Sequence, residues 1–244
     1  SEKETDFNKK KEYLKKAFDY SPDLADANRM SAYFYDMHLI LEKEKGSFRE
    51  EYLAFLTNHA ANQDDLLSTL LQITLQQPEY KAMLKTAYVK AKGSEVDFGK
   101  YWMKNVNQHA KTAPAITLSM LDKSKFSSKA GTGKWLLVDF WGTWCGPCRA
   151  EHPEMQKFFD STVKTNANKI TFLTIACRDT EDKVLNYMTE KQFSFPVAMS
   201  DNQVEKTYKV AGYPTKLLVT PEGKYLVVPF GADWISFVKH YADL

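Results

Sequence analysis

The chain has 244 residues, of which 43% are hydrophobic and 14% aromatic, a composition that supports a buried core and excludes a disordered tail. Its 33 basic and 31 acidic residues nearly cancel, giving a formal net charge of +2 without a dense basic block, so nucleic acid is not expected as a partner. The length is long for one compact unit and predicts two domains.

The first residues of the chain indicate a processed protein, whereas the number of cysteines leaves the compartment open. The chain begins Ser1-Glu-Lys-Glu4, without Met or an apolar leader, which we interpret as a processed product that has lost a signal segment. No apolar run approaches the roughly 20 residues that span a bilayer, so a membrane connection is expected only through a removed N-terminal anchor. Three cysteines, all after residue 140, indicate chemistry rather than a disulfide-stapled scaffold.

Residues 1–112 are expected to form an all-α domain, because they hold only two of the nine prolines and three of the ten glycines and show helical periodicity. The expected helices are Phe7 to Phe18, Asp23 to Leu41, Ser47 to Ala61, 66–75, Pro78 to Lys92 and Val96 to His109. An apolar stripe marks the second helix, a capping box at Ser47 starts the third, and Gly93 closes the fifth. The aromatic stripes are interpreted as core. Partner docking, dimerisation or shielding of a site elsewhere remain possible roles.

The composition changes after Ala113, where seven prolines, seven glycines and all the cysteines follow, so the second domain is placed at 113–244. A short strand over 115–121 and a polar connection over 122–133 come first. The expected elements are then strand 134–141, helix 146–165, strand 169–177, helix 181–192, strand 195–199, helix 204–208, strands 215–220 and 224–229, and a helix from Asp233. This alternation predicts an α/β domain, a mixed sheet with helices on both faces.

Two thiols lie two residues apart in Trp144-Cys-Gly-Pro-Cys-Arg149, where a buried strand should turn into a helix. Gly146 and Pro147 occupy the expected first turn, which places Cys145 exposed at the helix N-terminus and Cys148 one turn inward. Free backbone N–H groups and the helix dipole stabilise a thiolate there. Cys145 is therefore the predicted nucleophile, and Cys148 resolves the mixed disulfide that Cys145 forms.

A zinc site is the main alternative for this pair of thiols. It would need further ligands, but the only other cysteine is Cys177 and no second Cys-x-x-Cys follows, so no metal site is predicted. Cys177 ends an apolar run and is expected to be a buried structural thiol rather than a redox group.

The segment from Val138 to Cys148 resembles the active-site segment of thioredoxins, and Cys148-Arg-Ala-Glu-His-Pro153 is similar to the form found in TlpA/ResA-type thioredoxin-like proteins of the bacterial envelope. The resemblance covers residues 114–244. Further motifs in the family's order are Phe195-Pro-Val197 with Asp201, Val210-Ala-Gly-Tyr-Pro-Thr215 and Pro221-Glu-Gly-Lys224.

The resemblance implies roles for residues outside the dithiol. Asp139 matches a buried carboxylate beneath the disulfide, with a raised pKa that lets it take the proton of Cys148; a solvent-facing Asp is the alternative. Pro214 matches a cis-proline facing the dithiol, where a cis bond would leave the backbone of Tyr213 open to an extended substrate segment; a trans turn is the alternative. The residues expected to bind substrate are Trp144, Gly146, Pro147, Tyr213 and Pro214. Tyr213 is bulkier than the family's usual aliphatic residue and is expected to restrict or redirect partner choice.

The function implied is a thiol–disulfide oxidoreductase whose only redox group is the Cys145–Cys148 pair, without a cofactor. The Gly-Pro dipeptide favours reduction of disulfides in extracytoplasmic proteins, in the periplasm or cell envelope of a bacterium. Substrates would be proteins awaiting haem attachment or misoxidised proteins, and a membrane or thioredoxin-type donor would supply electrons. One alternative is a thiol peroxidase, although Val138 stands where the peroxiredoxin motif has Pro. The other is a non-catalytic partner-binding module.

Overall fold

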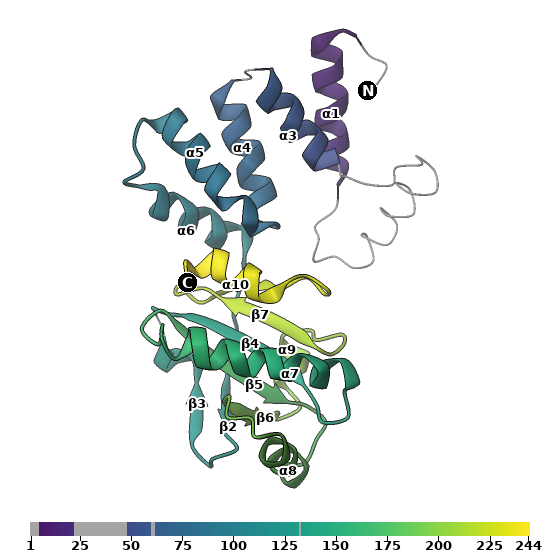
Figure 1. The fold of residues 1–244 in the computed structure, drawn as a ribbon, viewed down its shortest axis with the longest axis vertical. Coiled ribbons are helices and arrows are strands. Elements are labelled where there is room, and N and C mark those ends of the chain that lie inside the picture. The colour runs from purple at the N-terminus through teal and green to yellow at the C-terminus, as the bar shows by residue number, and fades with distance from the viewer. Residues whose placement is uncertain (1–4, 22–47, 60–61, 132) are drawn as a thin grey trace. The chain divides into compact units, whose positions relative to one another are not determined.

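The computed structural model describes residues 5–21, 48–59, 62–131 and 133–244 (Figure 1). The chain forms two compact units, Ser1–Met103 and Lys104–Leu244. The stripe predicted from Asp23 to Leu41 and the capping residue Ser47 lie outside the described residues.

Every described element of the first unit is helical, as predicted. The elements are α1 (Phe7–Tyr20), α3 (Phe48–Asn58), α4 (Gln63–Thr74), the 3-10 turn η2 (Pro78–Tyr80), α5 (Lys81–Lys92) and the start of α6 (Phe98–His109). Asp6 caps α1 by accepting the Lys9 N–H at 3.0 Å. Gly93 closes α5 with φ +78°, a conformation that glycine adopts without strain. The deepest side chains of this unit are Leu56, Leu70, Ile73, Leu84 and Trp102.

The division between the units falls after Met103, inside α6, whereas the change in composition places it at 112. Helix α6 leads into β1 (Lys111–Thr112), which pairs antiparallel with β8 (Lys224–Val227). The last turn of α6 is also joined to the second unit, because the Thr220 hydroxyl donates to the Asn107 side chain at 2.8 Å. The end of this helix therefore groups with the sheet.

The second unit contains a six-stranded mixed sheet in the order β1-β8-β7-β4-β5-β6. Its remaining strands are β4 (Trp135–Trp141), β5 (Ile170–Ala176), β6 (Val197–Met199) and β7 (Thr215–Val219). Strand β4 lies parallel to β5 and antiparallel to β7, and all of its residues are buried. The predicted mixed sheet is confirmed, with its most buried strand leading directly to the dithiol.

The polar connection predicted over 122–133 contains a strand that the sequence analysis missed. Strand β3 (Lys125–Ser127) pairs antiparallel with β2 (Thr117–Ser119), and Leu118 lies opposite Phe126. Phe126 packs against the core of the sheet. A single apolar residue among Ser, Lys and Gly gives no alternating pattern, so this strand is stabilised by its partner rather than by its own sequence.

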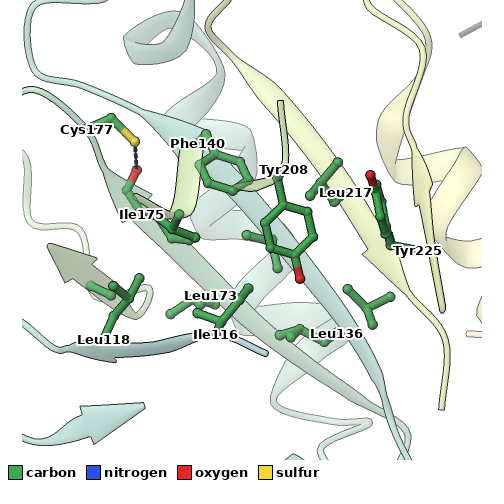
Figure 2. Packing of buried hydrophobic residues seen from close by; sticks show 14 residues of the cluster. Ile116, Leu118, Leu136, Phe140, Leu173, Ile175, Cys177, Tyr208, Leu217 and Tyr225 are labelled. Atoms are coloured by element: carbon green, nitrogen blue, oxygen red, sulfur yellow. Dashed lines mark hydrogen bonds between the residues drawn. The ribbon is translucent and has the colours of Figure 1, made fainter. Parts of the chain in front are cut away.

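Helices cover both faces of the sheet, as predicted. They are α7 (Gly146–Phe158), which continues into the π-helical turn η4 (Phe159–Val163), α8 (Glu181–Lys191), α9 (Val204–Thr207) and α10 (Trp234–Ala242). Successive residues of β4 point to opposite faces. Val138 and Phe140 join the core cluster that includes residues of β5, α9 and β2 (Figure 2). Trp141 points the other way, against His152 of α7, so Asp139 shares the α7 face.

Candidate active site

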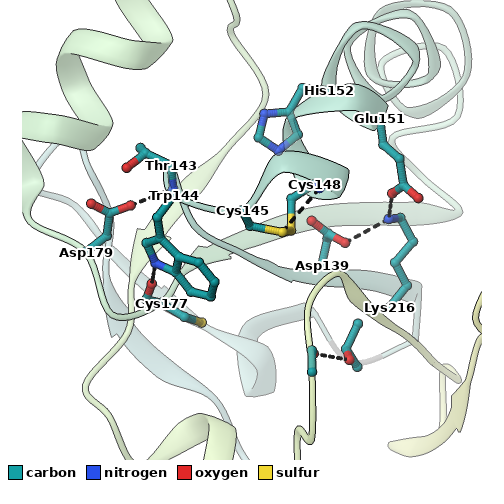
Figure 3. The surroundings of a disulfide bond; sticks show 12 residues. Asp139, Thr143, Trp144, Cys145, Cys148, Glu151, His152, Cys177, Asp179 and Lys216 are labelled. Atoms are coloured by element: carbon teal, nitrogen blue, oxygen red, sulfur yellow. Dashed lines mark hydrogen bonds and ion pairs between the residues drawn. A yellow bond between two sulfur atoms is a disulfide. The ribbon is translucent and has the colours of Figure 1, made fainter.

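The dithiol lies where β4 gives way to α7. Cys145 is the N-cap of α7, with extended backbone (φ −86°, ψ 105°), and its sulfur accepts the backbone N–H of Cys148 at 3.2 Å. Pro147 sits in the first turn, where its missing N–H costs no helical hydrogen bond. The two sulfurs form a disulfide of 2.02 Å, with the Cα atoms 5.3 Å apart (Figure 3). The local sequence thus holds both sulfurs at the positive end of a helix.

The prediction that Cys145 is exposed is wrong for this disulfide form. Cys145 is only 5% exposed and Cys148 1%, although Gly146 and Pro147 between them are exposed. The reason is the disulfide itself, because it directs the Cys145 sulfur inward to a buried partner. Only a small part of Cys145 is therefore accessible to a reacting thiolate in the disulfide form.

Asp139 lies beneath the disulfide in the middle of β4, and it is completely buried. The solvent-facing alternative is therefore wrong. Figure 3 shows its carboxylate pointing toward the disulfide. Burial raises the pKa of Asp139 to about 6, an effect that the nearby Lys216 ammonium partly offsets. Near neutral pH the carboxyl group can thus exist in both protonation states.

Lys216 lies in the candidate site and was missed by the sequence analysis. It faces Asp139 across the β4–β7 pairing, is 6% exposed, and places its ammonium 2.9 Å from the Asp139 carboxylate. This contact is ionic but lacks hydrogen-bond geometry, and both Asp139 oxygens have no hydrogen-bond partner among the described residues. The ammonium donates instead to Glu151 of α7 (Figure 3). The available signal for a buried charge was a lysine within the predicted strand 215–220, directly before Leu217-Leu-Val219.

The two neighbouring carboxylates keep the buried Lys216 side chain charged. Burial alone would lower the pKa of Lys216, but the carboxylates of Asp139 and Glu151 raise it above its usual value, so the ammonium persists. Glu151 is the partner that reaches the surface, because its side chain is 35% exposed. Lys216 thus links the buried Asp139 carboxyl group to Glu151 of α7, which is partly exposed to solvent.

The raised pKa of Asp139 makes the stability of the oxidised protein depend on pH. The group's ordinary pKa is 3.8 and its folded value is about 6, so its contribution is complete below pH 3.8 and is lost as pH rises through about 6. We expect Asp139→Asn to remove this loss, so that the stability of the variant relative to wild type rises by on the order of 3 kcal/mol between pH 4 and pH 7.5, at about 1.4 kcal/mol per unit. Urea unfolding at several pH values between 4 and 7.5 measures the difference.

The matched control for that experiment is Asp160→Asn, which removes a carboxylate from an exposed pair with Lys164. The pKa of Asp160 is lowered by its side-chain contacts with Lys164 and Gln156, so its contribution to the pH dependence has the opposite sign. If wild type and Asp139→Asn unfold with the same pH dependence, Asp139 is not the group with the raised pKa.

The loop before β7 provides the second side of the site. The bond between Tyr213 and Pro214 is cis, as the resemblance implies, and the Thr215 hydroxyl donates to the Gly212 carbonyl at 2.7 Å. The Tyr213 ring meets the Trp144 ring edge to face, with centroids 5.3 Å apart. Two residues predicted to bind substrate, from separate loops, are thereby brought into contact.

Three nearby side chains are packing residues or inert groups. Trp141 is completely buried and contributes to the core. His152 packs against it and shares a hydrogen bond of 2.9 Å between its Nδ1 and the Tyr187 hydroxyl. Burial lowers the pKa of His152 to about 4, so the imidazole is neutral at neutral pH. Cys177 is a buried thiol, as expected, and burial followed by the Glu205 charge raises its pKa far above the ordinary value.

The described residues contain no group of three or more His, Cys, Asp or Glu side chains arranged to hold a metal ion. None of their helices combines the length and apolar character of a membrane span.

Three features of this unit define the class of thioredoxin-like dithiol proteins. The sheet is mixed, its central strand leads to a Cys-x-x-Cys disulfide at a helix N-terminus, and a cis-proline loop lies beside that disulfide. Residues 110–226 match the AhpC/TSA family. Thiol-disulfide oxidoreductase ResA of Bacillus subtilis (strain 168) is 31% identical over 133 residues, which cover 54% of this chain and 73% of that protein. The chain therefore belongs, through its second unit, to the ResA-type thioredoxin-like family.

Two further comparisons set the extent of the similarity. ResA of Bacillus thuringiensis subsp. konkukian (strain 97-27) is 31% identical over 117 residues, and this chain spans 66% of its length. The crystal structure of a thiol:disulfide interchange protein of the thioredoxin family from Chlorobium tepidum TLS has 28% sequence identity and a TM-score of 0.47. That similarity covers 55% of this chain and 97% of the Chlorobium chain.

Proposed function

We propose that this protein is a thiol–disulfide oxidoreductase that reduces disulfides in extracytoplasmic proteins with the Cys145–Cys148 dithiol. The observation that carries the proposal is the disulfide at the N-terminus of α7 with the buried Asp139 carboxyl group beneath it. The helix end favours a thiolate at Cys145, and the carboxyl group supplies a base for Cys148. These are the two ionisations that a dithiol reductase needs.

The reaction transfers two electrons from the dithiol to the substrate disulfide. The Cys145 thiolate attacks one substrate sulfur, the substrate S–S bond breaks, and the first substrate thiolate leaves. Cys148 then gives its proton to the Asp139 carboxylate and attacks the Cys145 sulfur. The mixed disulfide breaks, the second substrate thiolate leaves, and the Cys145–Cys148 disulfide remains. A donor must reduce that disulfide before the next cycle.

Lys216 and Glu151 support the proton transfer in this scheme. The ammonium of Lys216 lies 2.9 Å from Asp139 and opposes the effect of burial on its pKa. The carboxyl group is therefore an acceptor near neutral pH rather than a permanently protonated acid. Glu151 holds the ammonium from the other side. The first substrate-facing residues are Trp144, Gly146 and Pro147, with Tyr213 and Pro214 on the opposite loop.

The proposal extends to the direction, compartment and partners. The Gly146-Pro147 dipeptide favours the reducing direction, and the resemblance to envelope proteins favours the periplasm or cell envelope of a bacterium. The substrates are disulfide-containing proteins, either misoxidised or awaiting haem attachment, and a membrane or thioredoxin-type protein supplies electrons. No cofactor other than the redox-active disulfide takes part.

Reduction of insulin disulfides tests the proposed activity. With dithiothreitol as donor, we expect the protein at micromolar concentration to accelerate insulin precipitation at least about tenfold over dithiothreitol alone, because the helix-stabilised thiolate reacts faster. Peroxide consumption is followed in parallel with the same donor. Consumption of peroxide without insulin reduction would favour a thiol peroxidase, and the absence of both activities would favour a non-catalytic binding module.

A further inference from the structure

A buried polar cluster lies behind the Trp144–Tyr213 ring pair, and the proposed reaction does not use it. Cys177 is completely buried and Glu205 is 8% exposed. The Tyr213 hydroxyl donates to one Glu205 oxygen at 3.5 Å, and the Ser200 hydroxyl donates to the other. The Cys177 thiol donates to the Ile175 carbonyl at 3.3 Å. Glu205 is thus a buried carboxylate that accepts from two hydroxyl groups, one of them the Tyr213 phenol.

The same cluster fixes the Trp144 ring. The indole N–H of Trp144 donates to the backbone carbonyl of Cys177 at 3.1 Å, and the Cys177 N–H is itself bound to Trp141 at 2.7 Å. Gly142 leaves room for the indole, because a Cβ at that position would lie 2.4 Å from the Trp144 ring nitrogen. Trp144 is therefore held in one orientation although it is 51% exposed.

Tyr213 is fixed from three sides. Its ring meets Trp144, its hydroxyl contacts Glu205, and the Arg178 guanidinium lies 5.6 Å over its ring. Burial, followed by Cys177 and Glu205, raises the pKa of Tyr213 to about 12, so the phenol remains a hydrogen-bond donor. In contrast, the backbone N–H and C=O of Tyr213 take part in no backbone hydrogen bond within the described part of the chain. The side chain is anchored, while the backbone is open to pairing.

The fixed side chain and unpaired backbone of Tyr213 suit an extended peptide as the ligand. An extended peptide can pair with the Tyr213 backbone as an added strand, and the two rings give it rigid apolar surface. Because the rings are already ordered, little conformational entropy is lost on binding. A small disulfide has no peptide backbone to pair, so it gains nothing from this preorganisation.

We propose that Glu205 and Cys177 are positioning residues that hold Tyr213 and Trp144 as a preformed surface for extended, disulfide-containing segments of protein substrates. This inference rests on the proposed function and adds to it a basis for preferring proteins over small disulfides. Cys177 contributes through its backbone carbonyl, which accepts from the Trp144 indole N–H, without a redox step of its own.

The test compares insulin with hydroxyethyl disulfide as substrates of the full chain, with dithiothreitol as donor. We expect Glu205→Ala to raise KM for insulin about fivefold, the effect of losing one ordinary hydrogen bond, with kcat nearly unchanged. The kcat/KM for hydroxyethyl disulfide should stay within about twofold of wild type. Glu205→Gln is the conservative variant, and its amide oxygen should restore most of the wild-type KM by accepting the Tyr213 hydroxyl.

A double-mutant cycle separates positioning from a general structural effect. Tyr213→Phe keeps the ring and removes only the hydroxyl, so it should raise KM for insulin by a similar factor. Adding Glu205→Ala to Tyr213→Phe should then cause little further change. Equal losses for both substrates, or effects that multiply in the double variant, would overturn the inference while leaving the proposed function intact. If Glu205→Ala does not fold, Tyr213→Phe decides alone, because an unchanged KM for insulin contradicts the inference.

The proposed function has a separate outcome in the same experiment. If wild type reduces neither insulin nor hydroxyethyl disulfide, the oxidoreductase proposal fails, and the inference fails with it. If the wild type accelerates the reduction of both substrates by the same factor over dithiothreitol alone, only the inference is contradicted, because the preformed surface then provides no preference for proteins.

Discussion

Cys148→Ala protein is expected to accumulate mixed disulfides through Cys145 when incubated with an oxidised protein substrate, whereas Cys145→Ser protein should form none. The reason lies in the order of the two attacks. Cys145 is the N-cap of α7, so its thiolate is stabilised by the helix end, while Cys148 is needed only to release the substrate. Turnover should fall on the order of a thousandfold or more in either variant, because each lacks one covalent step.

Non-reducing electrophoresis measures the trapped species, and mass spectrometry identifies the captured protein and the joined cysteines. The control is the double variant Cys145→Ser/Cys148→Ala, in which only the buried Cys177 remains. A mixed disulfide through Cys148 in the Cys145→Ser protein would reverse the assigned roles. Capture through Cys177 in the double variant would contradict its assignment as an inert thiol.

Lys216→Met is expected to have the second largest effect, on both the pH profile and the stability. Lys216 lowers the pKa of Asp139 against the effect of burial, so its removal should move that pKa upward from about 6. The acid limb of the kcat profile for disulfide reduction should shift to higher pH by about one unit or more, because Cys148 then loses its base at neutral pH. The shift is measured with insulin between pH 5.5 and 9.

The same substitution leaves a buried carboxylate without its cation, and removal of one partner of a buried pair typically costs about 3–5 kcal/mol. We expect this cost at pH 8 and a smaller one at pH 5, where Asp139 is largely protonated. The control Lys164→Met removes an exposed partner of Asp160 and should change the stability far less, because solvent screens an exposed pair. Adding Asp139→Asn to Lys216→Met should restore much of the stability. Equal costs at pH 5 and pH 8 would show that Asp139 is not the group that Lys216 stabilises.

Much of the fold follows from local sequence patterns. Apolar spacing and capping residues such as Asp6 and Gly93 set the helices of the first unit, and the run from Trp135 to Trp141 predicts a strand buried on both faces. The dithiol could be found because its chemistry requires two cysteines at a fixed spacing. Strand β3 could not, since it depends on pairing with a strand that carries the apolar signal.

The parts of the site that sequence patterns miss depend on register. Asp139 is visible as an acid in an apolar strand, but its cation is 77 residues away and becomes a neighbour only through the pairing of β4 with β7. The low exposure of Cys145 was also missed, because it accompanies the bond to the buried sulfur of Cys148. Glu205 and Tyr213 meet in the same way, through a loop that brings α9 beside the cis-proline.

The pairing of Asp139 with Lys216 has a consequence for how the chain chooses its fold. A slip of one residue between β4 and β7 would place the ammonium opposite Val138 or Phe140, on the apolar face of the sheet, and leave two opposite charges buried apart. Such an arrangement is heavily penalised. We therefore expect the pair to exclude misaligned sheets during folding, so that a costly interaction in the finished protein ensures that a single alignment of the strands is reached.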